Sequence, residues 1–267
     1  MPSPVHTLIT GASSGFGAAL ARACAARGES LVLTARRLEQ LEQLAAELRR
    51  DHHAQAFAIA TDLSLPGAAA SLVEELRRRD LAVHTLVNNA GFGLRGDFHT
   101  IAWPRGEAML QLMVTAPAEL CHALLPAMRE RGDGRILNIA SLAGLIPGLP
   151  GSSLYSASKA FLIRFSQSLA AENRASGVRV LVVCPGYVRS GFHAALGPEA
   201  AARTARLPAP FWMEAEDLAD RCLAALDRGQ ELLVPGALNR GLAALGRYLP
   251  DRLAGTLSAG FSRKYRS

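Results

Sequence analysis

The sequence lacks the features that define membrane-spanning, exported and nucleic-acid-binding chains. No stretch approaches the roughly 18 uninterrupted apolar residues that span a bilayer, and the N-terminal segment MPSPVHTLIT has no charged region before a long apolar core. Aromatic residues make up only 6% of the 267 residues, and the formal net charge of +6 comes from scattered arginines. We therefore expect a soluble, cytoplasmic protein that binds no nucleic acid.

Cysteine is sparse as well. The four cysteines, Cys24, Cys121, Cys184 and Cys222, are far apart, and no two of them form a CxxC pair. This spacing favours neither a zinc site nor a set of structural disulfides, so no metal is expected.

Lysine is scarcer still. Of the 29 basic residues only Lys159 and Lys264 are lysines, and the other 27 are arginines. Lysine carries a compact charge and can lose its proton, whereas arginine spreads its charge over a planar fork and stays protonated. Lys159 ends the pentapeptide YSASK. Either it serves a site that needs a small cation, or a rare lysine lies there by chance.

Apolar residues make up 49% of the chain and charged residues 19%, as in a well-packed globular protein. Short strand-like runs alternate with segments whose apolar residues recur every three or four positions, as in helices. The predicted strands are residues 5–10, 30–35, 56–61, 84–89, 135–140, 178–183 and 231–235. This alternation predicts an α/β fold in which helices cover both faces of a parallel sheet. No repeat or linker is evident, so residues 1–267 are expected to form a single domain.

A glycine-rich turn, TGASSGFG, follows the first predicted strand and opens a helix. Gly11, Gly15 and Gly17 allow a tight turn, a close approach to a pyrophosphate and close packing of the helix on the sheet. The helix N-terminus adds free N–H groups. Such a turn alone is a weak signal, but its place in the first strand–helix unit favours dinucleotide binding over a plain connection.

The end of the second predicted strand indicates which dinucleotide binds. An NAD site usually has an acidic residue about 20 positions after the glycines, where it binds the ribose 2′-hydroxyl. The segment TARRLEQL instead has Arg36 and Arg37 and no carboxylate at the strand end. A guanidinium suits a 2′-phosphate, so NADP(H) is favoured over NAD(H). A solvated helix start is the alternative role for the two arginines.

Five motifs in order resemble those of the short-chain dehydrogenases/reductases, over about residues 5 to 235. They are the TGxxxGxG loop, NNAG at 88–91, the strand ILNIAS at 136–141, YSASK at 155–159 and PGYVRS at 185–190. The resemblance implies a Rossmann-type doubly wound sheet of seven strands. It also implies an NADP(H)-dependent oxidoreductase that interconverts a carbonyl and an alcohol.

The resemblance further implies three catalytic roles. Tyr155 would be the general acid/base, Lys159 would lower its pKa and hold the cofactor ribose, and Ser141 would orient the carbonyl. A tyrosine hydroxyl, with an ordinary pKa of about 10, does need a nearby positive charge, and residues four apart share a helical face. Ser141 ends an apolar strand, whereas the serines around Tyr155 resemble helix-capping residues.

The motifs also predict which residues line the two binding sites. The cofactor-binding residues are predicted to be Gly11, Ser13, Ser14, Gly15, Phe16, Gly17, Arg36, Arg37, Asp62, Leu63, Asn89, Ala90, Gly91, Tyr155, Lys159, Pro185, Gly186, Val188 and Ser190. The substrate-binding residues are predicted to be Phe92, Ser141, Leu142, Tyr155, Tyr187 and Phe192. Residues 186–213 are expected to form a substrate lid, whose aromatic side chains suit a mainly apolar substrate.

One residue of the family pattern is missing. About 22 residues after NNAG, the family has an asparagine that helps to hold a water passing protons to the lysine, and here that position is Met113. A thioether cannot replace the amide. Three alternatives follow: water reaches the lysine by another route, catalysis is slowed, or the chain is a catalytically weakened NADP(H)-binding sensor or scaffold protein. The intact Ser141, Tyr155 and Lys159 favour an enzyme.

Two other activities share some of these motifs. A 3-oxoacyl carrier reductase is a further alternative, because no residue selects the substrate. A sugar-nucleotide epimerase or dehydratase is disfavoured, because GxxGxxG and a longer C-terminal domain are absent.

Residues 236–267 lie beyond the resemblance and are expected to form a helical tail. Leu242, Leu245 and Leu249 make an apolar stripe, and basic residues surround it. Docking on the parent domain or on another subunit of a homodimer or homotetramer is the simpler expectation. Peripheral membrane contact is the alternative.

Overall fold

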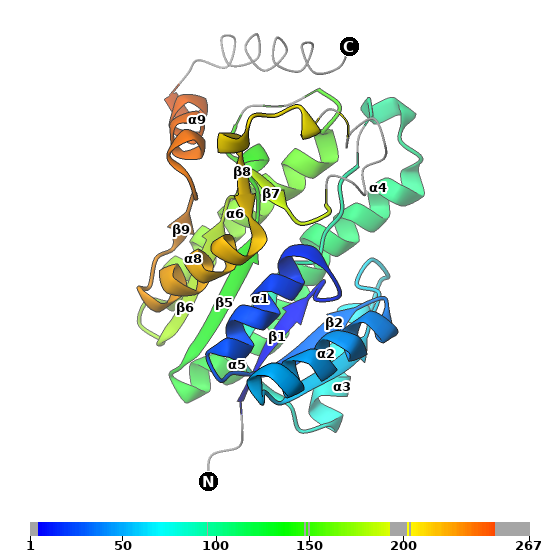
Figure 1. The fold of residues 1–267 in the computed structure, drawn as a ribbon, viewed down its shortest axis with the longest axis vertical. Coiled ribbons are helices and arrows are strands. Elements are labelled where there is room, and N and C mark those ends of the chain that lie inside the picture. The colour runs from blue at the N-terminus through cyan, green and yellow to red at the C-terminus, as the bar shows by residue number, and fades with distance from the viewer. Residues whose placement is uncertain are drawn as a thin grey trace.

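Seven strands form one parallel sheet at the centre of the molecule (Figure 1). The computed structural model describes residues 5–94, 96–146, 148, 150–192, 202 and 204–248. The sheet order is β3-β2-β1-β4-β5-β6-β9. The strands are β1 (Val5–Thr10), β2 (Ser30–Ala35), β3 (Ala56–Ala60), β4 (Ala82–Asn88), β5 (Gly134–Ile139), β6 (Val178–Val183) and β9 (Leu232–Leu233). The predicted doubly wound sheet of seven strands is confirmed.

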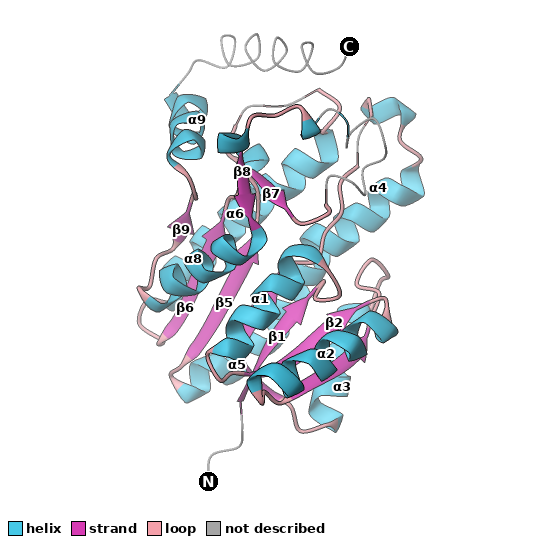
Figure 2. Cartoon of the chain, in the orientation of Figure 1, coloured by secondary structure: helices cyan, strands magenta, loops and turns pink. Residues whose placement is uncertain are grey.

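Helices cover both faces of the sheet, as Figure 2 shows. Successive strand residues point to opposite faces, so Ile9 packs in the core beneath α1, α2 and α8, while Leu8 packs beneath α3, α5 and α6. Both faces are buried, which is why the strands read as continuous apolar runs. The helices are α1 (Gly15–Ala26), α2 (Leu38–His52), α3 (Ala68–Arg78), α4 (Trp103–Leu110), α5 (Ala116–Arg131), α6 (Ser153–Asn173), α8 (Ala215–Asp227) and α9 (Ala237–Tyr248).

The strand order reverses at β1, which pairs with β2 on one side and β4 on the other. In such a sheet a crevice opens outside the carboxyl ends of the strands at the reversal point, because the flanking connections diverge to opposite faces. The turns after β1, β4, β5 and β6 all leave from this edge. The motifs TGxxxGxG, NNAG, ILNIAS and PGYVRS lie at the carboxyl ends of these strands, so the topology brings them to one edge of the sheet, and YSASK lies in the first turns of α6.

The connection between α4 and α5 is an irregular turn, η2 (Gln111–Thr115), which has π-helical hydrogen bonds. Together the three elements form a continuous helix, Trp103–Arg131, that is long and apolar enough to span a membrane. Its residues Ala116, Leu120 and Met128 nevertheless pack in the core against the sheet. We therefore assign it as a core helix.

Two short strands lie outside the main sheet and were missing from the sequence-based prediction. β7 (Tyr187–Arg189) and β8 (Trp212–Glu214) pair in parallel, with Tyr187 opposite Trp212 and Arg189 opposite Glu214. The predicted strand at 231–235 is reduced to the two residues of β9, which ends before Pro235, a residue without an N–H to donate. Parts of the predicted lid and tail, 193–201, 203 and 249–267, lie outside the described residues.

Candidate active site

The glycine-rich turn after β1 is built so tightly that side chains would not fit. Gly11 and Gly15 have φ angles of +68° and +57°, which residues with a side chain rarely adopt. A Cβ at Gly17 would overlap the carbonyl oxygen of Gly11, and one at Gly15 would overlap that of Ser190. Helix α1 begins directly after Ser14, so its first N–H groups face the edge of the turn. A dinucleotide diphosphate fits this arrangement.

The turn after β4 is fastened to the glycine turn by direct hydrogen bonds. The backbone N–H groups of Asn89 and Ala90 both donate to Thr10 Oγ1, at 3.0 Å, and Asn89 Nδ2 donates to the Thr10 carbonyl at 2.9 Å. Gly91 follows directly. Thr10 opens the TGxxxGxG motif but was absent from the predicted site. Its hydroxyl binds the turn after β4, and this contact between distant segments has no signal in the local sequence.

Of the two arginines after β2, Arg37 hydrogen-bonds to the glycine turn. Its Nη2 atom donates to Ser13 Oγ and Ser14 Oγ, each at 3.1 Å. Arg36 is exposed beside it. These contacts place a cation between the end of β2 and the glycine turn. A 2′-phosphate would meet a complementary charge there.

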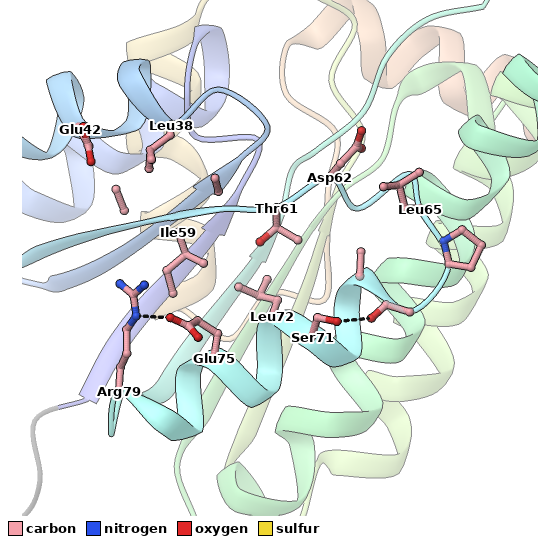
Figure 3. Close-up of a pocket in the computed structure, with 15 residues that line it drawn as sticks. Leu38, Glu42, Ile59, Thr61, Asp62, Leu65, Ser71, Leu72, Glu75 and Arg79 are labelled. Carbon is pink, nitrogen blue, oxygen red and sulfur yellow. Dashed lines mark hydrogen bonds and ion pairs between the residues drawn. The ribbon is translucent and has the colours of Figure 1, made fainter.

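Asp62 and Leu63 follow β3 at the same edge of the sheet. Asp62 Oδ1 accepts hydrogen bonds from Ser64 N at 3.0 Å and from Ser64 Oγ at 2.6 Å, and Leu63 is buried. An open pocket of about 800 Å³ lies beside Asp62, between α2, β3 and α3 (Figure 3). It contains none of Ser141, Tyr155 and Lys159. This hollow is therefore separate from the predicted catalytic residues.

Lys159 and Tyr155 lie on adjacent turns of α6, with Lys159 Nζ 5.8 Å from the centre of the Tyr155 ring. Lys159 is 6% exposed, and its Nζ atom donates to the Ile139 carbonyl at 2.8 Å. Burial disfavours the ammonium and lowers the pKa of Lys159 from its ordinary value of 10.5 to about 8. The hydrogen bond to Ile139 tethers Lys159 to the end of β5, two residues before Ser141.

Ser141 leaves β5 in an extended conformation and begins the short helix η3 (Leu142–Gly144). Its Oγ atom accepts a hydrogen bond from Ala143 N at 3.2 Å. Helix η3 packs directly on α6, because a Cβ on Gly144 would lie only 2.6 Å from the backbone carbon of Lys159. Ser141 is thus held beside the turn of α6 that carries Lys159.

Met113 lies in the π-helical turn η2 and is 1% exposed. It packs in an apolar cluster with Leu94 and Met109, and Tyr155 and Phe92 border this cluster. A Cβ on Gly91 would be 3.6 Å from Met113 Sδ, so the methionine faces the turn after β4. The side chain at the family's asparagine position is therefore buried, apolar and adjacent to Tyr155. Single π-helical turns of this kind are frequent at functional sites.

The segment after β6 reaches both parts of the site. Buried Pro185 accepts a hydrogen bond from Leu142 N at 2.9 Å, and the Ser190 carbonyl lies against Gly15. Gly186 packs against the side chain of Asn239 of α9. The last described lid residue before the gap, Phe192, has its ring centre 6.0 Å from that of Tyr155.

The β7–β8 ribbon ties the two ends of the lid together. The rings of Tyr187 and Trp212 are 5.5 Å apart, and the Arg189 guanidinium lies 5.0 Å from the centre of the Trp212 ring. Arg189 also pairs with Glu214, with 3.0 Å between Nε and Oε1. Tyr187, predicted to bind substrate, therefore packs on the base of the lid, and Val188 is partly buried against the core. No sequence pattern predicted this ribbon.

Comparisons with known proteins agree with this architecture. The family model described as short chain dehydrogenase matches residues 5–201. A sulfoacetaldehyde reductase of Chromohalobacter salexigens is 40% identical over 226 residues, which cover 80% of this chain and 84% of the relative.

Two solved structures show the same fold. A short-chain dehydrogenase from Sphingobium yanoikuyae in complex with NADPH is 34% identical with a TM-score of 0.79, covering 92% of this chain and 96% of that one. A bulky-bulky ketone specific alcohol dehydrogenase from Comamonas testosteroni is 31% identical with a TM-score of 0.76, covering 92% and 95%. The chain belongs to the short-chain dehydrogenase family, whose members are oxidoreductases.

Proposed function

We propose that this protein is a single-domain, NADP(H)-dependent oxidoreductase that interconverts a carbonyl and an alcohol on a mainly apolar substrate. The observation that carries the proposal is the buried Lys159 beside the Tyr155 ring, tethered by the Ile139 carbonyl to the strand end that holds Ser141. The names of the relatives support carbonyl chemistry, and the NADPH complex of the Sphingobium structure supports the cofactor.

Tyr155, Lys159 and Ser141 have separate roles in the reaction of the substrate carbonyl. Bound NADPH would supply the hydride to the carbonyl carbon. The Tyr155 hydroxyl donates its proton to the carbonyl oxygen, and the Lys159 ammonium favours the phenolate that this leaves behind. Ser141 Oγ already accepts from Ala143 N, which leaves its O–H to donate to the same oxygen and orient it.

The cofactor preference rests on charge at the glycine turn. Arg37 reaches Ser13 and Ser14, so its guanidinium would meet a 2′-phosphate where an NAD site has a carboxylate. Arg36 supplies further positive charge beside it. Ser190, another predicted cofactor contact, lies against Gly15 of the glycine turn.

The substrate class follows from the residues around Tyr155. Phe92, Leu94 and Met113 form an apolar wall beside it, and Phe192 approaches its ring from the lid. An apolar lining of this kind binds uncharged groups and excludes water. The names of the relatives include a small aldehyde that carries a sulfonate and bulky ketones, so they select neither the size nor the charge of the substrate.

The test is reduction of a carbonyl panel, from short aldehydes to bulky aryl ketones, by purified protein with NADPH or NADH. We expect oxidation of NADPH with at least one apolar ketone, weaker activity with NADH, and loss of activity in Tyr155→Phe. Tight NADPH binding with no turnover on any carbonyl would instead favour the sensor or scaffold alternative that Met113 raises.

A further inference from the structure

Gly186 lacks a side chain for a reason that lies outside its own backbone. Its φ angle is not in the left-handed region, so its conformation does not require a glycine. A Cβ at Gly186 would instead lie 2.7 Å from Oδ1 and 2.8 Å from Nδ2 of Asn239, in the first turn of α9. Atoms that are not bonded pack less closely than this. The glycine therefore makes room for the amide of Asn239.

The amide of Asn239 is held against Gly186 by its own hydrogen bond. Its Nδ2 atom donates to the Pro235 carbonyl at 2.8 Å, and Pro235 is buried just after β9. Gly236, with a φ angle of +89°, turns the chain between Pro235 and α9. Asn239 can move away from Gly186 only by giving up its bond to Pro235, so the contact is a fixed one.

The same face of α9 reaches a second segment of the crevice. Gly246 follows Asn239 by about two turns of the helix, so both residues face the same side. A Cβ on Gly246 would lie 3.2 Å from Ile146 Cα and 3.3 Å from the Leu145 carbonyl oxygen. Both of these residues come directly after η3, which begins at the strand end that holds Ser141. Helix α9 therefore bridges the segments that follow β5 and β6, at the carboxyl edge of the sheet (Figure 1).

The stretch that starts at Gly186 passes both sides of the crevice. Pro185, just before it, accepts a hydrogen bond from Leu142 N at 2.9 Å, and the Ser190 carbonyl lies against Gly15 of the glycine turn. Residues 186–190 include predicted cofactor contacts, and β7 at the base of the lid lies within them. A shift of the backbone at Gly186 would therefore move the cofactor wall and the lid together.

We infer that Asn239 is a positioning residue of the crevice. Its amide, locked to the Pro235 carbonyl, sets the path of the backbone at Gly186, and with it the place where residues 186–190 meet the cofactor. The inference rests on the proposed function for its effect on turnover, whereas its effect on the backbone does not. Because Asn239 acts through Gly186, it should change binding more than the chemical step.

Amide hydrogen exchange of the protein without cofactor tests the effect on the backbone. Asn239→Ala should speed exchange in residues 186–190 about three- to tenfold, because a fixed contact is lost, and should leave exchange in α3 unchanged. Leu245→Ala is the matched control, since Leu245 is 51% exposed on the same helix and should exchange as wild type in residues 186–190. Faster exchange confined to α9 in Asn239→Ala would give the residue a role only in its own helix and would overturn the inference.

A double substitution tests the pairing of glycine and amide directly. Gly186→Ala should weaken NADPH binding about tenfold, because its methyl group meets the Asn239 amide. In Gly186→Ala with Asn239→Ala the methyl group has room, so NADPH should bind more tightly than to Gly186→Ala alone. Losses that simply add in the double variant would show that the two residues do not act through one contact, and the inference would fail.

Kinetics with the best ketone of the panel separate positioning from chemistry. Asn239→Ala should raise KM for NADPH or for the ketone about three- to tenfold and keep kcat within about twofold of wild type. A lower kcat with unchanged KM values would contradict a positioning role. If the wild type reduces no carbonyl, the proposed function fails, and the exchange measurement, which needs neither cofactor nor substrate, still decides the role of Asn239.

Discussion

The cofactor side and the substrate side of the crevice are held together in different ways. On the cofactor side, the glycine turn and the turn after β4 are joined through Thr10 and Asn89 by direct hydrogen bonds, with backbone atoms too close for any side chain. On the substrate side, the apolar cluster that contains Met113 packs against Tyr155, and the Phe192 ring lies 6.0 Å from the Tyr155 ring. Backbone geometry tolerates little change, whereas apolar walls can be rebuilt. The cofactor side should therefore determine the stability of the fold and the choice of cofactor, and the substrate side should determine which substrates bind.

Two substitutions, one on the cofactor side and one on the substrate side, should show the largest difference between the two sides. Gly17→Val places a side chain on the Gly11 carbonyl, so we expect the free energy of unfolding to fall by about 3 kcal/mol and NADPH binding to be lost. Phe192→Ala on the lid should leave both unchanged and alter KM for the substrate. Urea denaturation and NADPH titration measure these effects, with Gly241→Ala, which meets no atom within 4 Å, as the control.

Burial of Lys159 should lower the free energy of unfolding by an amount that depends on pH. Because the pKa of Lys159 is about 8 in the folded protein and 10.5 in its ordinary state, the unfolded chain holds one more proton between these pH values. Wild-type stability should therefore rise with pH from about 8 to about 10.5, by at most about 3 kcal/mol, relative to Lys159→Met. Urea denaturation at several pH values measures this difference. A Lys264→Met variant should follow wild type, and equal slopes in all three proteins would refute the cost of burial.

The next prediction concerns the role of Arg37 in cofactor preference. Arg37→Ala should weaken NADPH binding about 10- to 100-fold, because a charge-assisted contact to the 2′-phosphate is lost, and should leave NADH binding unchanged. Arg36→Ala should have a smaller effect, since it is Arg37 that hydrogen-bonds to Ser13 and Ser14 in the turn. Fluorescence titration with both cofactors measures this, and an equal loss for NADH would mean that Arg37 only supports the turn.

The smallest expected effect concerns Met113. Met113→Asn places an amide beside Tyr155, so turnover should rise about three- to tenfold if a water relay to Lys159 is restored. The free energy of unfolding should fall by about 1–3 kcal/mol, because the position is buried among apolar residues. Met113→Leu keeps the volume without the amide and should change neither. Unchanged turnover in Met113→Asn would show that water reaches Lys159 by another route.

Local patterns were enough to predict the strands of the sheet and the glycine turn. The strands of the sheet follow from their apolar runs, and the glycine turn follows from Gly11, Gly15 and Gly17, because its requirements are local in sequence. The sequence could not separate Arg36 from Arg37, since only the path of the chain decides which side chain reaches Ser13 and Ser14.

The substrate side was harder to predict because it depends on contacts between distant segments. β7 and β8 are three residues each and lie far apart in the chain, so Trp212 has no neighbour in sequence that would indicate its pairing with Tyr187. The leucines of α9 predicted an amphipathic helix. They did not indicate that Gly246 and Asn239 would face the protein instead.

The central claim is proton transfer by Tyr155, and turnover of Tyr155→Phe tests it most directly. With the best ketone of the panel and saturating NADPH, kcat should fall about 100- to 10,000-fold, because the ring remains while the hydroxyl is lost. The affinity for NADPH, measured by titration, should stay unchanged. A Tyr155→Phe variant that keeps the wild-type kcat would contradict the account.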